Sequence, residues 1–260
     1  MQLHEQRAER TNLEHFVTRL RRLSTVGSTE EAAIRGLWRT ARHVPASSII
    51  DANEGIRLIT RGWAAWLRYS DDGRRLIFLY LLPGDFIIPG LFQLQCCDLV
   101  SLTPLRTVDA NSLLPTKGDH APRSAAIIAE SGSYYRLLLL DHLTRLTIGC
   151  TTRSVAHLLV ELHARSTRSG ACEGDRFSFP IGQRVLARSL GRSTVQVNKV
   201  IKQFQTEGML SVGFDWIEMH DVERLRALCG MSHSVFHPAR AFAGITQGTD
   251  RMHMAEQVCP

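Results

Sequence analysis

The sequence predicts an α+β fold with three successive parts: an N-terminal antiparallel β domain, a long helical segment and a C-terminal winged helix-turn-helix. Short apolar runs broken by Gly, Pro and Asp fill residues 49–114, and helical spacing dominates residues 134–168. Two short helical patterns then flank Gly191 before a hairpin pattern. With 260 residues, 44% hydrophobic and 22% charged, the chain can bury one or two cores.

The β domain is placed at residues 13–130, after a polar stretch, residues 1–12, that is predicted to be a disordered tail. Within the domain, WAAWLRY and RRLIFLYLL flank Ser70-Asp-Asp-Gly73, a hairpin signal in which Gly supplies a positive φ. Alternate residues of the second strand are apolar, which predicts one apolar face. These residues are Leu76, Phe78, Tyr80 and Leu82.

The helical segment, residues 131–168, is predicted to be a dimerisation helix. Its apolar residues step by 4, 3, 4 and then by 4, 3, which is the narrow seam of a coiled coil. The predicted dimer interface consists of Leu139, Leu143, Leu146, Cys150, Val155, Leu159 and Leu162. An ordinary amphipathic helix packed on the β domain would show the same period, and Gly149 leaves a kink or two separate helices open.

Residues 169–175, SGACEGD, are small and polar and are predicted to be a linker. The winged helix-turn-helix is placed at residues 176–230. Residues 231–260 show no sustained period and are predicted to form a second disordered tail.

The segment QRVLARSLGRSTVQVNKVIKQFQTEG has the pattern of a helix-turn-helix. Ala187 is small where the second helix crosses, and Gly191 permits the left-handed turn. Ser193 and Gln196 fit a capping box at the start of the second helix, and a glycine follows its end. Downstream, MLSVGFDWIEMH predicts two short strands, the wing.

The second helix of this motif is predicted to be amphipathic. The residues expected on its buried face are Val197, Val200, Ile201 and Phe204. On the opposite face, Lys can donate to guanine, Gln or Asn can pair with adenine, and Val or Thr methyl groups can contact thymine. The predicted base-contacting residues are Arg192, Thr194, Val195, Gln196, Asn198 and Lys199. The predicted phosphate-contacting residues are Gln183, Arg184, Arg188, Ser193 and Lys202.

The positive charge is concentrated in the same region. The formal net charge is +6, and between Arg176 and Thr206 the chain carries six cations and no Asp or Glu. This distribution favours a polyanionic partner, double-stranded DNA, over a merely basic surface.

With these pieces in place, the chain resembles the Crp/Fnr family of bacterial transcription regulators from about residue 16 to residue 229. The resemblance is strongest in PIGQRVLARSLGRSTVQVNKVIKQFQTEGML, and particularly to the branch whose recognition helix reads V-H-V-N-R, here Val195 to Lys199. Three short motifs, GWA from residue 62, DGRR from residue 72 and LPGD from residue 82, resemble the family's β-roll. Thr147 to Arg165 resembles its dimerisation helix.

The resemblance implies a cyclic-nucleotide-binding-like jelly roll as the sensor. It also implies a homodimer on a near-palindromic operator with half-sites about 34 Å apart, and RNA polymerase as a further partner. The family's commonest recognition pattern, Arg-Glu and then Arg four residues later, corresponds here to Thr194, Val195 and Lys199, so a different operator is expected.

The effector is unknown. Family members that bind cyclic AMP carry Gly-Glu after the Pro-Gly-Asp turn, and Gly-Glu occurs nowhere in this sequence. The N-terminal segment has no Cys, which excludes the family's iron–sulfur sensor, and no cofactor is expected. Cys96 and Cys97 are adjacent in the sequence, and two interpretations of the pair are open. One is a redox sensor, and the other is two small, half-buried residues with no role in sensing.

Other functional classes lack their motifs. The sequence has no G-x-S-x-G, Walker, G-x-G-x-x-G or H-E-x-x-H motif, so no enzyme is expected, and no C-x-x-C pair that would indicate zinc. No apolar run reaches the length of a membrane span, and a cytoplasmic protein is predicted. The alternative function is a small-ligand sensor that acts mainly through protein–protein contacts.

Overall fold

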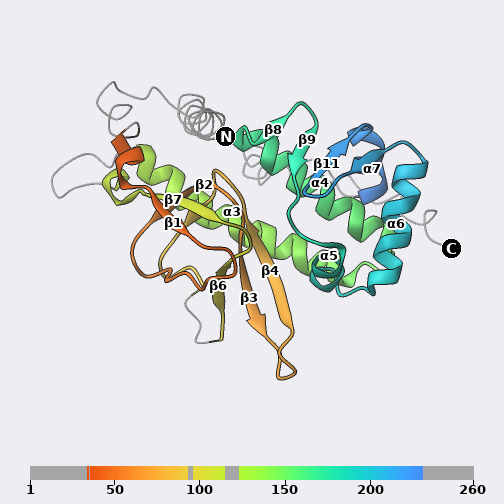
Figure 1. Ribbon diagram of the computed structural model, residues 1–260, viewed down its shortest axis with the longest axis horizontal. Helices are drawn as coiled ribbons and strands as arrows, with labels where there is room; N and C mark the ends of the chain where they lie inside the picture. The colour runs from red at the N-terminus through yellow and green to blue at the C-terminus, as the bar shows by residue number, and fades with distance from the viewer. Residues whose placement is uncertain (1–33, 35, 93–95, 115–122, 231–260) are drawn as a thin grey trace, which may run out of the picture. The chain divides into compact units, whose positions relative to one another are not determined.

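The computed structural model describes residues 34, 36–92, 96–114 and 123–230, so both predicted disordered tails lie outside the described residues. The chain divides into two compact units, of which the first holds residues up to 136 together with 168–171. The second holds residues 137–167 and those from 172 onward. Figure 1 labels most of the helices and strands of both.

The first unit contains two antiparallel sheets, in agreement with the predicted β domain. One sheet has the order β1-β7-β2-β5 and the other the order β4-β3-β6. The strands are β1 (Arg42–Val44), β2 (Arg57–Arg61), β3 (Ala64–Tyr69), β4 (Arg75–Leu81), β5 (Phe86–Ile87), β6 (Asp98–Ser101) and β7 (Leu105–Asp109). Two 3-10 turns, η1 (Leu37–Thr40) and η2 (Asn111–Leu113), flank the first sheet in sequence.

The predicted hairpin joins β3 and β4. Gly73 has φ +74° and its N–H donates to the Ser70 carbonyl at 2.8 Å, which closes the turn. The predicted apolar face is buried only in its second half, since Tyr80 and Leu82 are buried but Leu76 is exposed and Phe78 half-buried. On the other face Ile77, Leu79 and Leu81 are buried as well. The strand is apolar on both faces, so alternation could not indicate which face lies inside.

Helix α3 (Arg123–Thr147) begins in the first unit and ties to its core through Tyr135. The Tyr135 hydroxyl accepts from the Phe86 N–H at 2.7 Å and donates to the Phe86 carbonyl at 2.9 Å. Phe86 in turn belongs to a buried cluster with residues that include Leu58, Val108 and Ile128. This arrangement secures β5 against the helix.

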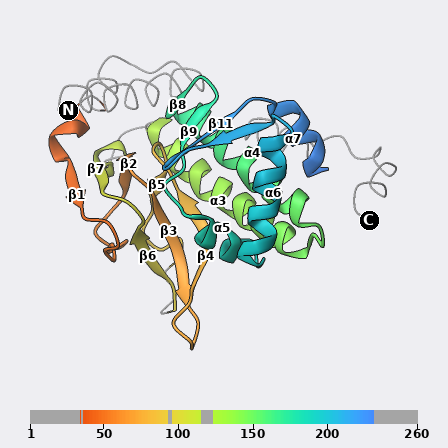
Figure 2. The same ribbon diagram turned by 45° about the vertical axis from the view of Figure 1, so that its right-hand side comes forward.

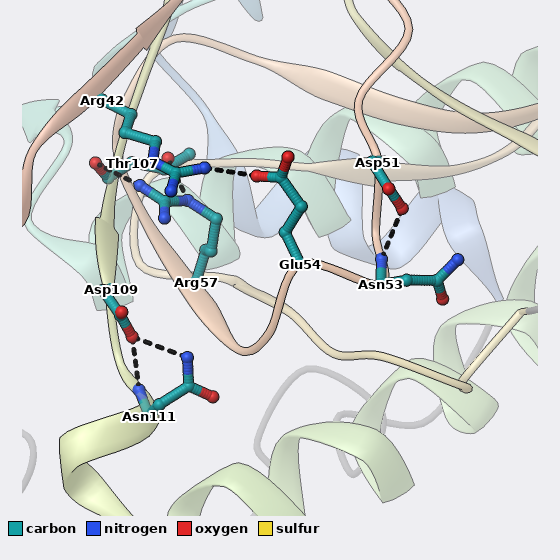
Figure 3. Close-up of polar contacts among 8 residues, drawn as sticks. All are labelled: Arg42, Asp51, Asn53, Glu54, Arg57, Thr107, Asp109 and Asn111. Atoms are coloured by element: carbon teal, nitrogen blue, oxygen red, sulfur yellow. Dashed lines mark hydrogen bonds and ion pairs between the residues drawn. The ribbon is translucent and has the colours of Figure 1, made fainter.

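A polar cluster connects β1, β2 and β7 (Figure 3). Arg57 is buried, and its guanidinium donates from Nε to the Thr107 hydroxyl at 2.8 Å and from Nη2 to the Thr107 carbonyl at 3.3 Å. Burial and then the neighbouring Arg42 lower the pKa of Arg57. Arg42 itself pairs with Glu54, so these side chains fix the central strands of the first sheet.

The described residues of the second unit form the C-terminal half of α3 and four further helices. These are α4 (Thr151–Ser169), which belongs to this unit as far as Thr167, α5 (Gln183–Ser189), α6 (Thr194–Thr206) and α7 (Val222–Cys229). Its sheet has the order β10-β11-β9-β8. The strands are β8 (Cys172–Glu173), β9 (Arg176–Ser178), β10 (Leu210–Val212) and β11 (Trp216–Met219). Figure 2 shows the helices of this unit gathered beside its sheet.

Two predicted boundaries differ from these elements. The predicted dimerisation helix at 131–168 is two helices, α3 and α4, separated at residues 148–150, where the sequence had left this alternative open. The predicted linker at 169–175 contains β8, which pairs with β9 through Cys172 opposite Phe177 and Glu173 opposite Arg176. Gly174 turns the chain between the two strands with φ +63°.

Candidate nucleic-acid interface

The turn between α5 and α6 has the geometry that the sequence predicts. Leu186, Ala187 and Leu190 are buried, and Gly191 adopts φ +61°, a conformation that a residue with a Cβ rarely takes. The Arg192 N–H donates to the Ala187 carbonyl at 2.9 Å, which closes the turn after α5. The chain then enters α6 at a fixed angle.

Helix α6 begins with the predicted capping box. The Ser193 hydroxyl accepts from the Gln196 N–H at 3.2 Å, and the Gln196 side-chain oxygen accepts from the Ser193 N–H at 3.2 Å. The predicted inner face is confirmed, since the buried residues of the helix are Val197, Val200, Ile201 and Phe204. The opposite face is therefore held outward by a packed core.

The outward face of α6 presents most of the predicted base-contacting residues. Val195 is 79% exposed, Lys199 and Gln196 are exposed, and Thr194 and Asn198 are half-buried. Because Val195 is so exposed, its side chain contributes no hydrophobic burial to the protein's own core. The Gln196 side-chain oxygen is committed to the capping box, which leaves its amide nitrogen as the group to face a partner.

Arg192 is placed differently from its prediction. Its side chain is half-buried, and its Nη2 donates to the Ile148 carbonyl, just beyond the C-terminus of α3. Helix ends leave carbonyls without helical partners, and a guanidinium is a suitable donor to them. Arg192 as it stands connects the helix-turn-helix to the end of α3 and does not point freely outward with Lys199.

The predicted phosphate-contacting residues all lie at the surface. Gln183, Arg184, Arg188, Ser193 and Lys202 are exposed. Within the described part of the chain, no ion pair involves Arg184, Arg188, Lys199 or Lys202. Arg176 differs, because it pairs with Glu218 at 2.6 Å and lies 4.1 Å from the centre of the Trp216 ring. Four uncompensated cations thus remain on the α5–α6 surface.

The wing adds a residue that sequence reasoning missed. Phe214, at the tip of the hairpin between β10 and β11, is fully exposed, and it is followed by Asp215. The signal available in the sequence was an aromatic residue at the tip of a predicted hairpin, a position that polar residues usually take.

Beneath the helix-turn-helix, α4 carries a buried charged cluster that the sequence did not indicate. Glu161 accepts from Arg165 at 2.9 Å and from Arg145 of α3, and Arg145 lies 3.0 Å from the Nδ1 of His157. Burial alone would raise the pKa of Glu161, but Arg145 and Arg165 lower it. Burial and then Glu161 raise the pKa of the neighbouring Asp141 to about 7.

The predicted dimer interface divides between the two helices. On α3, Leu143 and Leu146 are 57% and 43% exposed, Leu139 is half-buried, and Cys150 beyond the helix end is also half-buried. On α4, Val155, Leu159 and Leu162 are 0% exposed, so the prediction that these three face a second chain is wrong. Every residue from Ser154 to His163 is buried, and α4 is a core helix. Exposed Leu140 on α3 was missed.

Comparison with known proteins agrees with this geometry. Residues 154–228, which include most of α4 and all of α5, α6 and the wing, match the family model of the Crp-like helix-turn-helix domain. The structure is similar to that of FixK2 from Bradyrhizobium japonicum, with a TM-score of 0.60 and 20% identity over 74% of this chain and 98% of that one. Residues 154–228 thus form a Crp-like helix-turn-helix domain, and the chain has the fold of these Crp/Fnr-family structures.

Two further structures share this fold. TTHA1359, a CRP/FNR-family regulator from Thermus thermophilus, has a TM-score of 0.53 and 18% identity, covering 74% of this chain and 98% of its own. TTHB099, a CRP-family regulator from the same organism, has a TM-score of 0.54 and 16% identity, covering 74% and 97%. No curated protein matches the chain. The predicted fold class and family resemblance are confirmed.

Among the described residues, no helix is both long enough and apolar enough to cross a membrane.

Proposed function

We propose that this protein is a transcriptional regulator that binds a specific near-palindromic DNA operator as a homodimer, with α6 in the major groove. The observation that carries the proposal is the outward face of α6, where Val195 and Lys199 project from a helix whose opposite face is locked into the core. A helix fits the major groove and presents its side chains to the base edges there.

Each outward residue has a chemical role in this arrangement. Lys199 donates to guanine, the amide nitrogens of Asn198 and Gln196 donate to adenine N7, and Val195 and Thr194 contact thymine methyl groups. Arg184 and Arg188 of α5, with Lys202, Ser193 and Gln183, contact phosphates and set the register. Arg192 joins the base contacts when its guanidinium leaves the Ile148 carbonyl.

The two-fold partner in this proposal is a second copy that docks on α3. Leu143 and Leu146, with Leu140 beside them, give this helix an exposed apolar face that a second copy of α3 would bury. In this proposal the two α6 helices of the homodimer enter successive major grooves, whose centres lie about 34 Å apart, one helical turn of DNA. We further propose a cytoplasmic location and contact with RNA polymerase, and no catalytic activity.

The function is tested by selecting bound duplexes from a random pool with the purified protein. We expect enrichment of an inverted repeat whose half-sites are separated by one helical turn, with binding that weakens steeply between about 50 and 200 mM salt, as phosphate neutralisation requires. An unenriched pool would instead favour a ligand sensor that works through protein contacts.

The dimer is tested with Leu143→Asp combined with Leu146→Asp. This variant should be a monomer by light scattering and should bind the selected duplex weakly. A variant that stays dimeric would place the interface elsewhere.

A further inference from the structure

Two adjacent thiols lie at the surface of the β domain. Cys96 is exposed, Cys97 is half-buried, and both are free. Their Sγ atoms are 3.9 Å apart, so both sulfurs face the same side of the backbone although the residues are consecutive. In an extended strand successive side chains point to opposite faces, and this pairing is therefore a local departure from strand geometry.

The pair is anchored on its C-terminal side. Strand β6 begins at Asp98, the next residue, and Asp98 lies opposite Leu67 of β3 in the antiparallel ladder. The side chain of Arg68 is close enough to Cys97 to act on its charge. The thiols thus directly precede an edge strand, and the pairing of Asp98 with Leu67 fixes the residue that follows them.

This spacing does not suit a disulfide. Consecutive Cα atoms lie about 3.8 Å apart across a trans peptide, whereas disulfide-linked Cα atoms are usually about 4.4–6.8 Å apart. An internal Cys96–Cys97 disulfide would be strained, so the two groups are expected to remain thiols. Burial and the contact with Cys96 raise the pKa of Cys97, which disfavours oxidation of this sulfur through its thiolate.

The spacing does suit two bonds to one soft atom. A trivalent centre with a lone pair is pyramidal, so its two sulfur ligands lie somewhat closer together than in a tetrahedral site. The two sulfurs, 3.9 Å apart here, reach that spacing by a small rotation about their Cα–Cβ bonds. Soft thiophilic centres prefer such sulfur ligands. Among the described residues, no group of three or more His, Cys, Asp and Glu could hold a metal ion, so a site with three or four protein ligands is not available.

We propose that Cys96 and Cys97 form a bidentate dithiol site for a trivalent arsenical of the class R–As(OH)₂, a thiophilic centre that needs only two protein ligands and brings its third substituent. Two As–S bonds form and two As–O bonds break. The two thiol protons leave with the two hydroxyl groups as two molecules of water, and no atom changes oxidation state. Because both thiols are on one chain, the second bond closes a ring.

The test uses reduced full-length protein and phenylarsine oxide. The protein is treated with the arsenical, its remaining thiols are blocked with N-ethylmaleimide, and the arsenical is removed under denaturing conditions with 2,3-dimercaptopropanol. The thiols released are then labelled with iodoacetamide and located by peptide mass spectrometry. We expect labels on both Cys96 and Cys97, and an adduct that excess 2-mercaptoethanol does not remove.

Cys96→Ser and Cys97→Ser should each weaken phenylarsine oxide binding by on the order of 10²-fold or more, because closure of the ring is lost. Cys172→Ser, which removes another half-buried free thiol, is the matched control and should bind as the parent does. Labels at other cysteines only, removal by a monothiol, or undiminished binding by Cys96→Ser would each overturn the proposal. None of these measurements involves DNA, so their outcome is independent of the operator proposal.

Discussion

Helices α4 and α6 belong to the same unit and are both amphipathic by sequence, yet only one of them offers a face to a partner. On α6 the residues opposite the core are exposed, with Val195 and Lys199 among them. On α4 every residue from Ser154 to His163 is buried, including Glu161 and His157. Apolar residues at helical spacing identify the side of a helix that packs into the core. Whether the opposite side is exposed and can bind a second molecule depends on the elements that surround the helix.

The sharpest way to break this comparison is to remove a charge from the buried face of α4. Glu161→Gln leaves Arg145 and Arg165 buried without their carboxylate, and it should lower the free energy of unfolding by about 3–5 kcal/mol. Urea denaturation measures this loss. Glu223→Gln, which removes the exposed partner of Arg226, is the control and should cost no more than about 1 kcal/mol.

A second pair of variants separates core from interface. Leu159→Ala should lower the free energy of unfolding by about 2–5 kcal/mol through the cavity it leaves, without changing the dimer dissociation constant. Leu143→Ala, on the exposed face of α3, should raise the dimer dissociation constant and leave the free energy of unfolding of the protomer nearly unchanged. Denaturation and dilution experiments on both variants decide the matter, and weaker dimerisation by Leu159→Ala would return α4 to the interface.

On the exposed face of α6, Lys199→Ala should weaken binding to the selected operator by about 1–3 kcal/mol and relax the preference at one base pair. Fluorescence anisotropy with operators varied at each position measures both effects. Lys202→Ala, assigned to a phosphate, is the matched control and should weaken all sequences alike. An unaltered preference in Lys199→Ala would argue against direct readout.

The buried cluster also predicts a pH effect. Since the pKa of Asp141 is about 7 in the folded chain and about 3.9 when unfolded, the folded state holds an extra proton between these values. The contribution of Asp141 to the free energy of unfolding is therefore present at low pH and is lost as the pH rises through 7. Asp141→Asn stays neutral and should gain stability relative to the parent as pH rises from about 5 to about 8.

His142 and His157 act in the opposite direction, because burial, and then Arg145, lower the pKa of each to about 4. Both the parent and Asp141→Asn contain these two histidines, so their effect on stability largely cancels when the free energies of unfolding of the two proteins are subtracted. Equilibrium denaturation at several pH values measures that difference, and a gap between variant and parent that is constant with pH would contradict the raised pKa.

The smallest expected effect concerns Val195. If its methyl groups contact a thymine methyl, replacing that thymine with uracil should cost the parent about 0.8 kcal/mol of binding free energy. The same replacement should cost Val195→Ala less. Equal losses in both proteins would exclude the contact.

The helix-turn-helix could be predicted from the sequence because its signals are local and agree with one another. Gly191 supplies the turn, Ser193 and Gln196 supply the cap, and the apolar residues of α6 share one face, so nearby residues determine each feature. The antiparallel character of the β domain was predictable for the same reason, from the turn at Gly73.

The rest depends on contacts between residues far apart in the chain. Arg145 and Glu161 meet because two helices pack together, and no period in either helix indicates it. Arg192 reaches the Ile148 carbonyl, 44 residues earlier, which removes it from the outward face where helical spacing had placed it. In β4, both faces are apolar, so only the packing of the two sheets determines that Ile77 and not Leu76 is buried.

The central claim is that the outward side of α6 distinguishes one DNA sequence from another. Its most direct test is the ratio of dissociation constants for a scrambled duplex and for the selected duplex, measured in the same salt. The account predicts a ratio of about 10³ or more, and a ratio near one would contradict it.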